Sequence, residues 1–129
     1  MNCYVVKIND KDYMLRLSVR NIINLEKKMN MNPLSVFTKM GENELPKIED
    51  MMIVFHESLQ YQVKIENQGR AARGEKQDYA ITFEDAEALY DEYMDEGKTY
   101  VEFIQLIMEI FKVSGLFKEE TSKGKKAKN

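Results

Sequence analysis

Hydrophobic residues cover most of the circumference of one segment, residues 100–114. Between Tyr100 and Val113 the strongly polar residues are Glu102, Gln105, Glu109 and Lys112. This spacing places them on one narrow stripe of a helix. A helix at a protein surface needs an apolar stripe of only about 100°. We therefore predict that this helix is surrounded by the rest of the chain and that no other segment contributes as much to the fold.

Apolar and polar residues alternate in two short segments near the N-terminus, residues 3–8 and 12–17. Such alternation is typical of a strand with one buried face. Asn9, Asp10 and Lys11 lie between the segments and favour a tight turn. We predict a β-hairpin over residues 3–17. Because a two-stranded sheet alone is marginally stable, helices should cover its apolar face.

Helical spacing of apolar residues predicts further helices at about residues 18–30, 33–40, 46–65 and 83–96. Ser18 and Thr82 are suited to the N-cap positions, and Gly97 to the end of the fourth helix. Residues 67–79 contain little that could be buried, so a mobile loop is expected there. The predicted fold class is α+β, mainly α: an N-terminal β-hairpin packed against about four or five helices, with a C-terminal αα-hairpin.

The length of 129 residues suits one globular domain, which we place at residues 1–117, before a disordered lysine-rich tail at 118–129. The net charge is −3, but the tail holds five Lys and two Glu, so the body is more acidic. An acidic body argues against nucleic acid as a ligand. Cys3 is the only cysteine, which fits a reducing compartment. Apolar runs are too short to span a membrane, and early charges lead us to expect no signal peptide.

Residues that could support catalysis or metal binding are sparse. His56 is the only histidine and has no neighbouring His or Cys in the sequence. Residues 91–102 match both ends of a calcium-binding loop, but Tyr93 and Glu96 stand where a ligand and a glycine are needed. Helix capping explains this stretch better. We therefore predict no enzymatic activity, no cofactor and no metal.

The chain contains nine methionines, several of them near the middle helices. Methionine commonly fills gaps in a core, but methionine-rich surfaces also bind varied apolar segments. The second interpretation predicts a partner-binding surface made of Met51, Met52, Phe55, Tyr90, Tyr93 and Met94. The many acids of residues 83–96 are either a solvated face or a contact for a basic partner.

The order of several short motifs carries a family resemblance. They are Tyr13-x-Leu15-x-Leu17-Ser18-x-Arg20, Ile22-x-x-Leu25-Glu26-Lys27, Asn32-Pro33, Thr82-x-Glu84-Asp85, Leu89-x-Asp91-Glu92-Tyr93, Gly97 and Ser114-Gly115-Leu116-Phe117. Over about residues 4–117, this order is similar to that of the tail assembly chaperones of long-tailed bacteriophages, including prophages of Gram-positive bacteria.

The resemblance implies a non-catalytic protein of the host bacterial cytoplasm. Such a protein binds and solubilises the tape measure protein until tail tube subunits polymerise around it, and is absent from the mature virion. The implied partners are thus the tape measure protein, with the tail tube protein and a second copy of the chain as further options. The alternative is a structural or adaptor protein, such as a head–tail joining component, that forms a stable oligomer.

The family is often made in two lengths by translational frameshifting near the end of the gene. Gly124-Lys125-Lys126 is compatible with a slippery run of adenines. We hypothesise that a longer product exists; a solubilising tail is the alternative, and the codons would decide between them.

Overall fold

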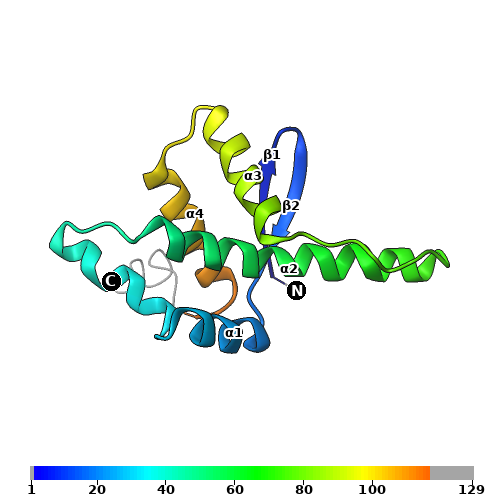
Figure 1. The fold of residues 1–129 in the computed structure, drawn as a ribbon, viewed down its shortest axis with the longest axis horizontal. Coiled ribbons are helices and arrows are strands. Elements are labelled where there is room, and N and C mark those ends of the chain that lie inside the picture. Colours follow the sequence, from blue (N-terminus) through cyan, green and yellow to red (C-terminus); the bar gives the residue numbers. More distant parts are fainter. Residues whose placement is uncertain (1, 117–129) are drawn as a thin grey trace, which may run out of the picture.

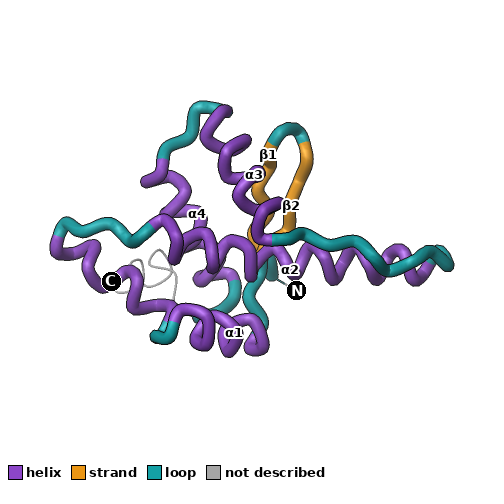
Figure 2. Tube along the Cα trace, in the orientation of Figure 1, coloured by secondary structure: helices purple, strands orange, loops and turns teal. Residues whose placement is uncertain are grey.

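A computed structural model of the protein describes residues 2–116 (Figure 1, Figure 2). The elements are β1 Tyr4–Ile8, β2 Lys11–Leu15, α1 Val19–Met29, the 3-10 helix η1 Pro33–Glu42, α2 Ile48–Ala72, α3 Phe83–Asp95 and α4 Tyr100–Val113. The predicted class is confirmed: an N-terminal hairpin followed by several helices, in a mainly helical α+β fold. The predicted tail at 118–129 and its Gly124-Lys125-Lys126 segment lie outside the described residues.

The hairpin forms as its sequence predicts. Tyr4 lies opposite Leu15, and Ile8 lies opposite Lys11. Asn9 and Asp10 both have positive φ values, 53° and 65°, which is the requirement of the two-residue type I′ turn. The face that carries Ile8 and Leu15 is buried against the helices. This burial explains why apolar and polar residues alternate along the two strands.

Helix α2 runs along the longest axis of the molecule and contacts most of the other elements (Figure 1). It packs against β2, α1, α3 and α4. Its first half carries the fully buried side chains Met51, Val54, Phe55 and Leu59. Two hydrogen bonds also join it to β2 and to the residue that follows β2: Met14 N–H to Gln62 Oε1 at 2.9 Å and Arg16 N–H to Ser58 O at 3.2 Å.

Helix α4 is largely enclosed, as its sequence predicts. Its fully buried side chains are Phe103, Ile104, Ile107, Ile110 and Phe111. The enclosure is incomplete at the first turn, where Val101 is 47% exposed. The expectation that this helix alone dominates the core needs correction, because α2 contributes fully buried side chains of the same kind.

The end of α2 also differs from the prediction. The helix continues to Ala72, so residues 67–72, predicted as part of a mobile loop, are helical. The Asn67 side chain donates to Tyr79 O and accepts from Tyr79 N–H, both at 3.0 Å. Arg70 pairs with Asp78 at 2.8 Å. These contacts hold the returning chain along the last turns of α2, which project from the body of the molecule (Figure 2).

Reciprocal capping defines the starts of α1, α3 and α4. In each, the N-cap hydroxyl accepts from a backbone N–H three residues later, whose own side chain accepts from the N-cap N–H. At α4 these residues are Thr99 and Glu102. Within residues 91–102, Thr99 and Glu102 thus cap a helix, as the capping interpretation predicts. The segment predicted as a short helix at 33–40 is the 3-10 helix η1 and extends to Glu42.

Candidate functional site

An apolar groove lies between the first half of α2 and helix α3, and we call it the α2–α3 groove. It has a volume of 510 Å³. Its lining consists of Ile48, Glu49, Met52, Phe83, Glu87, Tyr90 and Asp91. In Figure 1, α3 rises from the middle of α2 at a steep angle, so the two helices diverge. The groove lies between the side chains that these two helices contribute.

Helical spacing within each element builds the two walls. Ile48 and Met52 are four residues apart at the start of α2, so they share one face. On α3, Phe83, Glu87 and Tyr90 follow one another at spacings of four and three residues, again on one face. Thr82 caps α3 immediately before Phe83. The cap therefore fixes where this wall begins.

The groove has an exposed rim and a supported floor. Ile48 is 49% exposed and Phe83 is 36% exposed, whereas Met52 is 6% exposed. The half-buried Tyr90 ring contacts the buried Phe103 ring edge to face, with 4.7 Å between centroids. Burial, together with the negative charge of Asp91, raises the pKa of the Tyr90 phenol. Tyr90 is thus a neutral, aromatic part of the floor.

Every charged residue in the groove lining is acidic. Glu49 lies in the first turn of α2, while Glu87 and Asp91 lie on successive turns of α3. The apolar rim residues Ile48 and Phe83 lie among them. A segment with an apolar face flanked by lysine or arginine would complement this lining in both shape and charge.

The structure separates the six residues that the sequence predicts for partner binding. Met52 and Tyr90 come together in the groove. Met51, Phe55 and Tyr93 are buried in the core. These three side chains have little exposed surface in the folded chain, because α2 and α3 are covered on the faces that carry them.

Met94, the sixth residue, is partly buried against the core and does not line the groove. The predicted partner-binding surface did not include Ile48 and Phe83, which line the groove. Their positions in the first helical turns were the available signal, because the end of a helix is less often covered on all sides. Two acids of the rim, Glu87 and Asp91, belong to residues 83–96, whose acids the sequence predicts to be either a solvated face or a contact for a basic partner.

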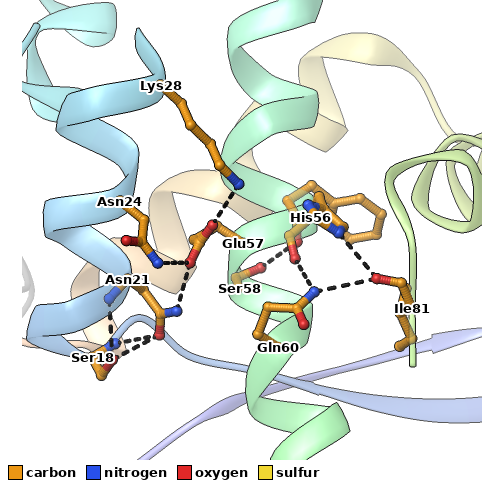
Figure 3. Close-up of polar contacts among 10 residues, drawn as sticks. Ser18, Asn21, Asn24, Lys28, His56, Glu57, Ser58, Gln60 and Ile81 are labelled. Carbon is orange, nitrogen blue, oxygen red and sulfur yellow. Dashed lines mark hydrogen bonds and ion pairs between the residues drawn. The ribbon is translucent and has the colours of Figure 1, made fainter. Parts of the chain in front are cut away.

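The polar side chains at the middle of α2 make structural contacts (Figure 3). His56 Nε2 donates to Ile81 O at 3.0 Å, and the His56 ring lies edge to face against Phe83. Gln60 Nε2 donates to the same carbonyl at 3.3 Å. His56 therefore holds the connection before α3 in place and supports one side of the groove.

Glu57 joins α2 to α1 through a carboxylate that accepts three hydrogen bonds (Figure 3). It accepts from Asn21 Nδ2 at 2.8 Å, from Asn24 Nδ2 at 3.0 Å and from Lys28 Nζ at 3.1 Å. Burial alone would raise the pKa of Glu57, but the hydrogen bonds from these three residues outweigh burial and lower it. The ionised carboxylate is occupied by these three donors, so the role of Glu57 is structural.

Within residues 2–116, no three or more His, Cys, Asp or Glu side chains come together as a metal site. Nor does that part of the chain include a helix of the length and apolarity needed to cross a membrane.

One family model matches residues 2–129, and its description is "Family of unknown function (DUF6096)". No curated protein and no solved structure matches the chain.

Proposed function

The chain belongs to this family, DUF6096, and from its surface we propose that it is a phage tail assembly chaperone that binds the tape measure protein. It keeps that protein soluble in the host bacterial cytoplasm during tail morphogenesis and is absent from the mature virion. The proposal combines the resemblance in the order of sequence motifs with one structural observation. That observation is the α2–α3 groove, with its apolar floor and acidic rim.

The groove suits a helix that carries a row of apolar side chains. Recognition of this kind uses anchors at i, i+3 or i+4 and i+7 along the bound helix. Ile48 and Phe83 offer apolar surface that is exposed in the unbound chain. Glu87 and Asp91 are placed to attract lysine or arginine beside the anchors. A long helical protein with many apolar turns would present such a row repeatedly.

The small size of the groove favours reversible binding. Burying one large apolar side chain completely contributes roughly 1.5–3 kcal/mol. Ile48 is already about half covered and Phe83 about two-thirds covered. Each 1.4 kcal/mol changes a dissociation constant about tenfold. One groove therefore supplies modest affinity, and several copies along a long client supply more. Release is then straightforward when tail tube subunits cover the client.

Co-expression with a phage tape measure protein tests the proposal. The wild-type chain should raise the soluble yield of that protein and should be missing from purified virions. Ile48→Asp should abolish the gain, because it places a charge in the exposed apolar rim. Val19→Asp is the matched control, since Val19 is 77% exposed on α1 and lies outside the groove. An unchanged soluble yield with the wild-type chain would refute the proposal.

A second candidate function is a structural or adaptor protein, such as a head–tail joining component, that forms a stable oligomer. The outer edge of β1, which no strand of the described part of the chain covers, favours it, because an open strand edge can join copies of a chain. Purified virions distinguish the two candidates. A joining component remains in the particle, whereas a chaperone does not.

A further inference from the structure

Within residues 2–116, no strand pairs with the outer edge of β1. The sheet has two strands, and β2 is covered on its outer side by the hydrogen bonds from Met14 and Arg16 to α2. In a two-residue hairpin the residues that flank the turn, Ile8 and Lys11, exchange hydrogen bonds, and pairing alternates from there. Val5 and Lys7 therefore direct their backbone N–H and C=O groups away from β2.

The contacts of the neighbouring strand support this alternation. Met14 lies opposite Val5, and its N–H also points away from the hairpin, toward Gln62. On the β1 side, no group within residues 2–116 forms a hydrogen bond with the backbone of Val5 or Lys7. Two consecutive outward positions of an otherwise regular strand are thus left without protein partners.

A groove of 820 Å³ follows this edge, and we call it the β1–α4 groove. Residues 4–7 form one wall, and Glu102, Gln105, Glu109 and Lys112 of α4 line the other. An added strand would lie about 4.8 Å from β1. The space beside the edge therefore leaves room for a further length of extended backbone.

We propose that two copies of the chain pair through their β1 edges about a two-fold axis beside Val6. Val5 of each copy then lies opposite Lys7 of the other, and each such pair exchanges two backbone hydrogen bonds. The result is one antiparallel sheet in the order β2, β1, β1 of the second copy, β2 of the second copy. Because the two outward residues are symmetric about Val6, the same edge serves both copies.

The side chains around the edge favour a second copy over a foreign strand of one charge. The lining of the β1–α4 groove carries both signs, with Lys98 and Lys112 on one hand and Glu102 and Glu109 on the other. Such a mixture selects neither a basic nor an acidic segment, whereas a two-fold axis can place opposite charges together.

On the exposed face of β1, the side chains of Val5 and Lys7 would also cover one another in the dimer. Val5 is 51% exposed, and pairing would cover it with the aliphatic part of Lys7 from the second copy. Lysine on an edge strand often serves to prevent pairing. Here Lys7 Nζ is drawn along the outer face to Asp12, at 3.1 Å, and leaves the backbone edge open.

Sedimentation equilibrium of the full chain over a wide concentration range tests the proposal, with a dimer as the expected result. Val5→Lys places an ammonium group opposite Lys7 of the second copy and should weaken the dimer about fivefold. Val5→Glu should strengthen it by a similar factor. Val19→Lys and Val19→Glu make the same chemical changes at an exposed position of α1 and should leave the dissociation constant unchanged.

A cross-link tests the register. The two-fold axis makes Val6 and Val6 of the second copy a pair without mutual hydrogen bonds, with about 4.5 Å between Cα atoms, which a disulfide can bridge. Val6→Cys in a Cys3→Ser background should cross-link on mild oxidation. Val19→Cys in that background should not. A chain that is monomeric throughout, a dimer indifferent to the charge at position 5, or a folded Val6→Cys variant that stays uncross-linked would each overturn the proposal.

Discussion

Glu57→Ala removes the carboxylate that joins α1 to α2. The side chain is 4% exposed and accepts hydrogen bonds from Asn21, Asn24 and Lys28. Lys28 is 48% exposed and regains water when the carboxylate is lost, so its contribution is small. A hydrogen bond to a charged group contributes roughly 1.5–3 kcal/mol. Two bonds from half-buried amides, at the lower end of that range, give an expected loss of about 3 kcal/mol.

Urea unfolding at pH 7 measures this loss, and Glu26→Ala is the matched control. Glu26 is exposed on α1, so its replacement should change the free energy of unfolding by less than about 0.5 kcal/mol. Glu57→Gln keeps the shape of the side chain and removes its charge, so it should lie between the control and the alanine variant. The melting temperature of Glu57→Ala should fall by roughly 10 °C.

Acid should reduce the difference between wild type and Glu57→Ala. The pKa of Glu57 in the folded chain lies below its ordinary value of 4.5. A lowered pKa contributes stability that is present above pH 4.5 and is lost as the pH falls through the folded pKa. A loss below about 1 kcal/mol at pH 7, or a difference independent of acid, would refute the assignment of the network as a tie between the helices.

Three further changes test other parts of the fold. Tyr100→Phe removes the hydrogen bond from the phenol to Pro46 O at 2.6 Å and should cost about 1 kcal/mol in urea unfolding. Burial raises the pKa of Tyr100 to about 12, so a spectrophotometric titration of this variant should lack one late-titrating phenol, and wild type should lose stability above pH 10. Phe103→Ala leaves a cavity at a side chain that is 1% exposed and should lower the free energy of unfolding by about 3–5 kcal/mol. A smaller loss than that of Tyr100→Phe would contradict the central position of Phe103 in the core. Asn67→Ala frees the returning chain at Tyr79, and limited trypsin digestion should cut the connection between α2 and α3 faster than in wild type.

Local signals predicted the hairpin and most helix ends. Positive-φ residues Asn9 and Asp10 set the turn, and Thr99 with Glu102 set the start of α4. The end of α2 was not predictable in this way. Gly69 and its charged neighbours are typical of a loop, whereas contacts with residues up to twelve positions later keep them helical. Such contacts cannot be predicted from the local composition of residues 67–72.

The candidate site was predictable only in part. Apolar spacing identified Met52 and Tyr90, which do line the groove. It also identified Met51 and Phe55, which the core covers. Periodicity reports that a helix face is apolar but not which neighbour covers it, and α2 is packed by elements on several sides. The open edge of β1 likewise depends on which strand finds a partner, and that is decided by the tertiary fold.

Tyr90 belongs both to the groove floor and to the aromatic contacts around Phe103. The groove therefore exists only while these rings are packed in the folded domain. Binding in the groove consequently opposes unfolding. A ligand that binds only the folded chain adds about 2.7 kcal/mol of stability at one hundred times its dissociation constant. Thermal shift measurements on a library of amphipathic peptides would therefore report binders directly, and the charge and spacing of the peptides that bind would describe the kind of segment that fits the groove.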